Sequence, residues 1–306
     1  MSTKLVLGID HGYKNIKSEH FCFPTAISEL KSLPDDKSGV LEYGGKIYTE
    51  NGEKIKFVNS SIKSDTEEFY LLTLFSIAKE LKVRKLNHVE ITLLAGLPQR
   101  WYESQKEEFQ KYLEKNKNNI FFKYEGAAYD IKIEKVKIFE QGYAAFMTLP
   151  NIGEYLSGEA CIVDIGGGTM DILPILNGKL QKSSCKIDTH ATIWLISKIQ
   201  ETIETELFNT ISETNIIEYM KNGFSETICS NKYEEIIKRE LQDYCKMVYT
   251  ILREKRINID ITPIIFVGGG AVIMKNFSAN QNGRREYVTN MKANAIGYQQ
   301  IYKLLY

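Results

Sequence analysis

The side chains best suited to chemistry in this sequence are two aspartates that stand just before glycine-rich turns. Asp10 ends one apolar run and precedes Gly12, and Asp164 ends another and precedes three consecutive glycines, 166–168. Glycine has no Cβ, so such a turn can present its backbone N–H groups to an anion at close range. A carboxylate beside the turn could hold the metal ion that accompanies the anion. Each turn, taken alone, could equally be an ordinary hairpin connection.

A common pattern of strands surrounds these turns. Residues 4–17 and 161–176 each read as strand, turn and return strand, and the first return strand carries Lys17. Residues 263–271 read as a buried strand that runs into a third glycine-rich loop, 268–270. Two Asp–Gly hairpins and one strand–glycine loop, in this order and about 150 and 100 residues apart, are far more specific than any one of them.

The composition limits the class of protein. The 306 residues suffice for two domains, and 39 basic side chains balance 39 acidic ones, which disfavours a chain-wide basic surface for nucleic acid. Five cysteines without a close pair disfavour a disulfide framework or a zinc site and fit a reducing cytoplasm. No signal peptide opens the chain, and no apolar run approaches the ~20 residues that span a bilayer. We therefore expect a cytoplasmic protein that binds neither membrane nor nucleic acid directly.

The three motifs resemble those of the actin, hexokinase and heat-shock-chaperone superfamily of ATPases. Residues 9–17 are similar to the first phosphate motif, residues 163–171 to the second, and residues 267–271 to the adenosine motif. Within the superfamily the chain looks most like the bacterial and plasmid actin-like proteins of the ParM type, and the resemblance covers essentially its whole length. It implies an α/β fold of two related domains, each with a mixed five-stranded sheet and flanking helices, with the nucleotide in the cleft between them.

The resemblance also implies a division of the chain. We expect domain I over residues 1–149, with an inserted subdomain at about 26–85, and domain II over residues 150–306, with a helical subdomain at about 188–255. Residues 139–146 and 292–298 resemble the two connecting segments that form a hinge between the domains. Their small residues would let helices cross closely there.

Site residues follow from the same resemblance. Those expected to bind nucleotide are Asp10, Gly12, Tyr13, Lys14, Asn15 and Lys17 in the first hairpin, Gly166, Gly167, Gly168 and Thr169 in the second, and Gly268, Gly269, Gly270 and Ala271 in the third loop. Asp10 and Asp164 would hold Mg²⁺ mainly through waters, and Asp164 is also expected to take part in catalysis. The cofactors implied are ATP, with GTP left open, and Mg²⁺.

The residue that positions the attacking water is expected in the first connecting segment. Gln141 is the candidate by alignment with the usual Pro-Gln-Gly-x-Gly-Ala form, but Glu140 stands where that form has proline, so the choice between Glu140 and Gln141 stays open. An exposed helix start with a carboxylate near it would explain the same residues without any catalysis.

The implied function is that of an actin-like ATPase that polymerises into nucleotide-dependent filaments and segregates plasmid DNA. Hydrolysis of ATP would drive filament turnover, and an adaptor protein would bind the centromere-like DNA. The alternative is a small-molecule kinase of the sugar type. A chaperone-like ATPase is disfavoured because no substrate domain follows the core, and a membrane-tethered division protein because no separate basic amphipathic tail is found.

Overall fold

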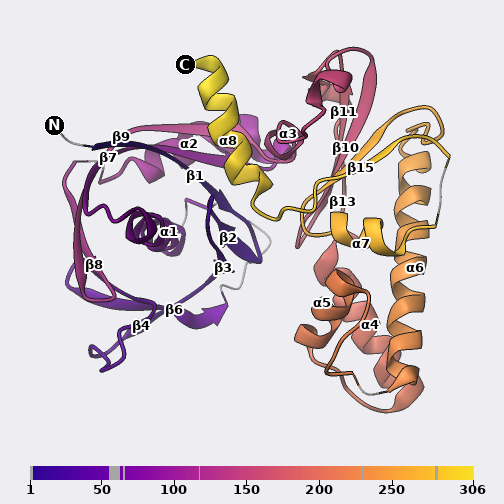
Figure 1. The fold of residues 1–306 in the computed structure, drawn as a ribbon, viewed down its shortest axis with the longest axis horizontal. Helices are drawn as coiled ribbons and strands as arrows, with labels where there is room; N and C mark the ends of the chain where they lie inside the picture. Colours follow the sequence, from indigo (N-terminus) through magenta and orange to yellow (C-terminus); the bar gives the residue numbers. More distant parts are fainter. Residues whose placement is uncertain (1–2, 55–62, 65, 117, 229, 280–281) are drawn as a thin grey trace. The chain divides into compact units, whose positions relative to one another are not determined.

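The computed structural model describes residues 3–54, 63–64, 66–116, 118–228, 230–279 and 282–306. The chain forms two compact units (Figure 1). Unit 1 comprises Met1–Met147 with Lys292–Tyr306, and unit 2 comprises Thr148–Met291. The chain therefore passes from one unit to the other twice. None of the described helices is both long and apolar enough to cross a membrane.

Unit 1 is built on a mixed sheet that has nine strands within the described residues. Their order is β3-β2-β1-β7-β9-β8-β5-β6-β4. The strands are β1 (Thr3–His11), β2 (Asn15–Lys17), β3 (Cys22–Pro24), β4 (Ala26–Leu30), β5 (Val40–Tyr43), β6 (Lys46–Lys54), β7 (His88–Leu97), β8 (Ile120–Tyr124) and β9 (Ala127–Glu140). Because β1, β7 and β9 run parallel, their carboxyl ends meet at one edge of the sheet.

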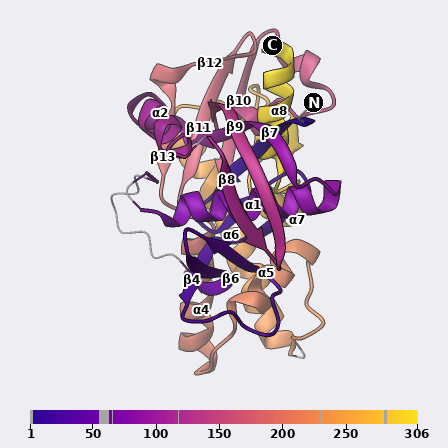
Figure 2. The same ribbon diagram turned by 90° about the vertical axis from the view of Figure 1, so that its left-hand side faces the viewer.

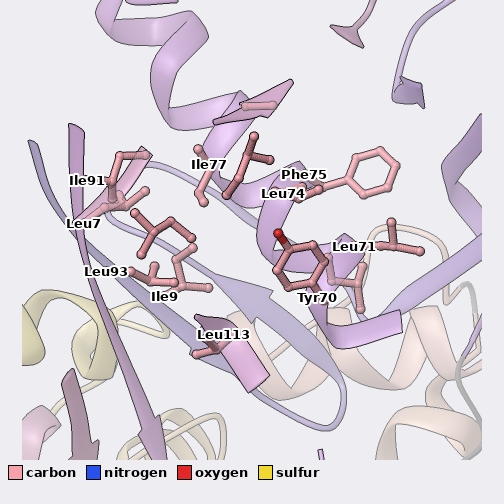
Figure 3. Close-up of a cluster of buried hydrophobic side chains, with 14 of the residues drawn as sticks. Leu7, Ile9, Tyr70, Leu71, Leu74, Phe75, Ile77, Ile91, Leu93 and Leu113 are labelled. Atoms are coloured by element: carbon pink, nitrogen blue, oxygen red, sulfur yellow. The ribbon is translucent and has the colours of Figure 1, made fainter. Parts of the chain in front are cut away.

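Helix α1 (Glu68–Arg84) is enclosed by this sheet. Twelve of its 17 side chains are buried, on every side of the helix, as expected when a helix is apolar all round. Figure 1 shows strands of the sheet on several sides of α1, and in Figure 2 β8 and β9 cross in front of it. Figure 3 shows Leu7 and Ile9 of β1, with Ile91 and Leu93 of β7, beside Ile77 of the helix. These side chains belong to one buried cluster, which forms the core of unit 1.

Three further helices complete unit 1: α2 (Gln99–Leu113), α3 (Tyr143–Phe146) and α8 (Ala293–Leu305). Helix α8 packs on β1 and α3 through positions that have no room for a side chain. A Cβ on Gly297 would collide with the backbone carbonyl of Ala144, and one on Gly8 with that of Ala295. Glycine at both positions lets the backbones approach closely. This explains why α8 packs on unit 1.

Unit 2 joins a smaller mixed sheet to a group of helices. The sheet runs β12-β11-β10-β14-β15, and β13 pairs with β11. Its elements are η1 (Ile152–Tyr155), β10 (Glu159–Ile165), β11 (Met170–Leu176), β12 (Lys179–Leu180), η2 (Lys182–Ser184), β13 (Lys186–Asp188), α4 (Thr192–Leu207), α5 (Glu213–Asn222), α6 (Asn231–Glu254), β14 (Ile264–Val267), α7 (Ala271–Phe277) and β15 (Arg285–Tyr287). Side chains of β10, β14 and α4 to α7 share one core.

The two-unit α/β architecture with mixed sheets agrees with the expected fold, but three details differ. Within the described residues the sheets have nine and six strands instead of five each; β4, β5 and β6 join the first through the pairing of β5 with β8, and the second includes the short strands β12 and β13. The region 26–85 is not a separate subdomain in its described part, since α1 is part of the unit 1 core. Residues 292–306, expected in domain II, belong to unit 1 because α8 packs there.

Because α8 and α3 cross closely, a side chain added at the crossing should destabilise the protein. Gly297→Ala places a methyl group against the carbonyl of Ala144 and should lower the free energy of unfolding by about 1–3 kcal/mol. Gly153→Ala is the control, because a Cβ there meets nothing within 4 Å. Thermal unfolding followed by circular dichroism measures both variants. Equal melting temperatures for the two would contradict this account of α8.

Candidate functional site

The carboxylate of Asp10 is the point on which the polar groups of unit 1 converge. It lies near the carboxyl end of β1 and is 2% exposed. Lys17, opposite it in the β1–β2 hairpin, places Nζ 3.2 Å from Oδ2. Gln141 donates a hydrogen bond from Nε2 to Oδ1 over 2.6 Å. Burial raises the pKa of Asp10, but the ammonium groups of Lys17 and Lys63 outweigh this effect and leave it below the ordinary value. Asp10 is therefore ionised at neutral pH.

Gln141 reaches Asp10 because it follows β9 at the shared edge of the sheet. Its backbone N–H donates to the carbonyl of Leu97, the last residue of β7. The next residue, Gly142, has φ of 73°, which favours glycine. The Gly142 N–H donates to Oδ1 of Asn294 over 3.0 Å. Both predicted connecting segments, 139–146 and 292–298, thus meet within unit 1 and hold Gln141 in place.

Glu140 and Gln141, which the sequence could not separate, differ in position. Glu140 is the last residue of β9 and pairs with Leu97. Gln141 lies just beyond the strand, and the hydrogen bond to Asp10 comes from its side chain. A residue that positions water must lie within hydrogen-bond reach of the reacting groups. The geometry around Asp10 therefore favours Gln141.

The turn of the first hairpin is fixed by a residue that the sequence did not single out. Thr25 is 2% exposed, and its hydroxyl donates to the carbonyl of Gly12 over 2.8 Å. Its backbone N–H donates to the carbonyl of Lys14 over 3.0 Å. A Cβ on Gly12 would lie 2.6 Å from Nζ of Lys17, so glycine leaves room for the lysine. Tyr13 has its ring 6.0 Å from that of Trp101.

A buried lysine and a buried histidine lie beside Asp10. Lys63 is 3% exposed and donates from Nζ to the carbonyl of His11 over 2.6 Å. Burial lowers the pKa of Lys63 to about 8, so the amine is mostly protonated at neutral pH. Sequence reasoning missed Lys63, because only tertiary contacts bring this polar region of the chain to β1.

His11 is fully buried, and its Nε2 lies 2.8 Å from Oγ1 of Thr73. The Thr73 hydroxyl donates to the carbonyl of Phe69, so the imidazole must donate to Thr73 and is assigned the neutral form with a proton on Nε2. Burial, helped by the charge of Lys63, lowers the pKa of His11 to about 3.

Unit 2 holds the second glycine loop between β10 and β11. Asp164 and Asp171 lie opposite each other in this hairpin, and the Gly166 N–H donates to the carbonyl of Thr169 over 2.9 Å. The first residues of α4 bind the loop from one side. The backbone N–H and the hydroxyl of Thr192 both donate to the carbonyl of Gly166.

The directions in which the N–H groups of this loop point follow from the hydrogen bonds that its carbonyls accept. Ile193 donates its backbone N–H to the carbonyl of Gly167. In a trans peptide the C=O of one residue and the N–H of the next point in opposite directions. Because the carbonyls of Gly166 and Gly167 face α4, the N–H groups of Gly167 and Gly168 face away from it. Gly168 is exposed, and a Cβ there would meet nothing within 4 Å, so the second loop can approach an anion.

The third loop, 268–270, is packed against the second hairpin. It follows β14, which is parallel to β10, so both strands end at the same edge of the sheet. Gly268 has φ of 78°, and a Cβ on it would collide with Oδ1 of Asp164. The Gly270 N–H donates to the carbonyl of Ile165 over 2.9 Å. At Gly269 a Cβ would meet nothing within 4 Å. Ala271 begins α7 and is fully buried.

The predicted residues therefore fall into two groups, each assembled within its own unit. Unit 1 brings Asp10, Gly12, Lys17 and Gln141 together, with Tyr13, Lys14 and Asn15 in the same hairpin. Unit 2 brings Asp164, Gly166, Thr169 and Gly268 together, with Gly167, Gly168, Gly269 and Gly270 in the same loops. Within the described residues, no group of three or more His, Cys, Asp or Glu side chains forms a metal cluster.

The low pKa of His11 predicts a loss of stability in acid. The folded protein keeps His11 neutral down to about pH 3, whereas an unfolded histidine takes up a proton near pH 6.5. Its contribution is therefore complete above pH 6.5 and is lost as the pH falls from there toward 3. Between pH 7 and pH 5 the loss should be about 2 kcal/mol. Urea unfolding of wild type and His11→Gln should show this extra loss in wild type alone, and parallel pH curves would contradict the assignment.

In a comparison with known proteins, two different family models match the N-terminal and the C-terminal part of the chain. The family model for the N-terminal domain of actin-like proteins matches residues 8–143, and the model for the Alp7A C-terminal domain matches residues 159–299. The two models together account for most of the chain. No curated protein matches it.

Solved structures share the fold across nearly the full length. The apo psk41 ParM protein is 19% identical with a TM-score of 0.70, covering 99% of this chain and 98% of its own. ParM of Bacillus thuringiensis with AMPPNP is 15% identical, with a TM-score of 0.71 and 98% of each chain covered. A 15-stranded ParM filament from Clostridium botulinum is 19% identical, with a TM-score of 0.68 and 99% of each chain covered. The solved structures show the fold, and the two family models show that the chain belongs to the actin-like proteins.

Proposed function

We propose that this protein is an ATPase that polymerises into filaments and disassembles them as it hydrolyses ATP. The observation that carries the proposal is the arrangement around Asp10. A buried carboxylate, two ammonium groups and the amide of Gln141 meet beside a glycine turn. Support comes from the Bacillus thuringiensis ParM, solved with AMPPNP, and from the Clostridium botulinum ParM, solved as a filament.

The phosphates would be held by backbone N–H groups and by Lys17. Transfer of a phosphoryl group depends mostly on positioning and on neutralising charge. The second hairpin offers the N–H groups of Gly167 and Gly168, which face away from α4. The first hairpin offers its turn at Gly12, fixed by Thr25. Lys17 adds a cation that is already oriented by its ion pair with Asp10.

A magnesium ion would be held by Asp10 and Asp164, mainly through its waters. The donor set fits this role, because carboxylates are the oxygen ligands that Mg²⁺ prefers. Both carboxylate oxygens of Asp10 already accept hydrogen bonds, from Lys17 and Gln141. A direct metal bond would compete with these contacts, whereas a bound water could donate to a free lone pair. When bound, the ion would neutralise charge on the phosphates.

Gln141 would orient the water that attacks the terminal phosphate. Its amide nitrogen donates to Asp10, so its carbonyl oxygen faces elsewhere and can accept a hydrogen bond from that water. Asp164, in the second hairpin, would also take part in catalysis. The adenosine would lie against Gly268 to Gly270, where Gly269 leaves open space.

The partners proposed are other copies of this chain and, through an adaptor protein, centromere-like plasmid DNA. Balanced charge, with 39 basic and 39 acidic side chains, fits a filament that does not grip DNA itself. A cytoplasmic location is part of the same proposal.

High-speed sedimentation with Mg-ATP, Mg-ADP or no nucleotide tests the proposal, with phosphate release followed in parallel. We expect ATP to send the protein to the pellet and hydrolysis to return it to the supernatant. Gln141→Ala should pellet with ATP but release phosphate about 10²-fold more slowly, because one oriented polar group is removed from the transition state. Glu140→Ala is the matched control and should turn over at close to the wild-type rate.

Two results would contradict the proposal. If wild type hydrolyses ATP at a rate independent of protein concentration and nothing pellets, the filament function fails and the sugar-kinase alternative should be screened with candidate acceptors. If Glu140→Ala is slowed and Gln141→Ala is not, the water-positioning role passes to Glu140.

A further inference from the structure

The buried polar cluster of unit 1 places two lysines beside one aspartate. Asp10 is ionised, and Lys17 and Lys63 both carry ammonium groups beside it. Within the described part of the chain, the ionised groups that act on Lys63 are Asp10 and Lys17. One carboxylate therefore faces two ammonium groups.

Packing alone does not explain a charged residue at position 63. The side chain lies 5.9 Å from the ring centroids of both Phe69 and Phe109 and is 3% exposed. Replacing a whole buried ion pair with apolar residues is often neutral or stabilising, whereas removing one partner leaves the other charge uncompensated. A methionine could fill the same space between the two rings. Position 63 is therefore charged for reasons of electrostatics, one of which is the compensation of Asp10.

The position of Lys63 connects this charge to the first hairpin. Its Nζ binds the carbonyl of His11, the residue between Asp10 and the Gly12 turn. Among the described residues that carbonyl is its hydrogen-bond acceptor, and an ammonium has three donors. The field of Lys63 therefore acts on the turn where the phosphates would approach, in a buried setting that screens it weakly.

We propose that Lys63 is a positioning residue of the phosphate site, a second cation whose charge favours the binding of polyphosphate and which holds the backbone of the first hairpin. This inference rests on the proposed function, because it concerns the same nucleotide. It predicts that the contribution of Lys63 grows with the number of phosphate charges on the ligand. A residue that only held the fold would affect all adenine ligands alike.

The test measures the affinities of adenosine, AMP, ADP and ATP by titration calorimetry at fixed ionic strength. Lys63→Met removes the charge and keeps most of the volume, and Lys63→Arg keeps the charge. Lys79→Met is the control, since Lys79 is another largely buried lysine of unit 1 that pairs with Glu50. Circular dichroism checks that each variant is folded. If Lys63→Met does not fold, Lys63→Gln retains a donor for the His11 carbonyl without the charge.

We expect Lys63→Met to weaken ATP binding by about tenfold or more, in line with the loss of one nearby charge, and to weaken AMP and adenosine binding progressively less. Lys63→Arg should recover most of the ATP affinity, and Lys79→Met should match wild type. Equal losses for all four ligands, or no loss, would overturn the inference while leaving the ATPase proposal in place. If wild type itself binds no nucleotide, both fail together.

Discussion

The buried carboxylate of Asp10 is the constraint on which the polar cluster of unit 1 depends. An ionised group that is 2% exposed must be compensated by charge and hydrogen bonds. Here the compensation comes from parts of the chain far apart in sequence: Lys17 from the hairpin, Gln141 from the end of β9, and Lys63 from the residues before α1. The contacts that compensate this one carboxylate therefore also orient the side chains of Lys17 and Gln141 and place the charge of Lys63 near the turn.

The second glycine loop, in unit 2, is held by backbone contacts instead. The start of α4 binds the carbonyls of Gly166 and Gly167, and Gly268 leaves no room for a side chain beside Asp164. Neither contact uses a charged side chain, and the N–H groups of Gly167 and Gly168 face away from α4, where an anion could bind them. Unit 1 therefore contributes mainly charge, and unit 2 contributes mainly oriented peptide groups.

The parts of the fold and of the candidate site that depend on residues close together in the sequence could be predicted from it. A hairpin places Asp10 opposite Lys17, and a strand that runs into three glycines indicates a loop at a sheet edge. What was missed depends on contacts between distant segments. The pairing of β5 with β8 enlarges the sheet, and the roles of Lys63, Thr25 and Thr192 appear only when the chain is folded. The choice of Gln141 over Glu140 likewise needed the end of β9 to be placed beside β1.

We propose that Lys17 and the backbone N–H groups of Gly167 and Gly168 bind the phosphates of one nucleotide. A cryo-electron microscopy map of the protein with magnesium and AMPPNP tests it most directly. The account predicts the terminal phosphates in contact with Lys17 and with the backbone N–H groups of Gly167 and Gly168. It also predicts the side chain of Gln141 facing the last phosphorus atom. Phosphates bound away from these groups, or a map without nucleotide at saturating concentration, would contradict it.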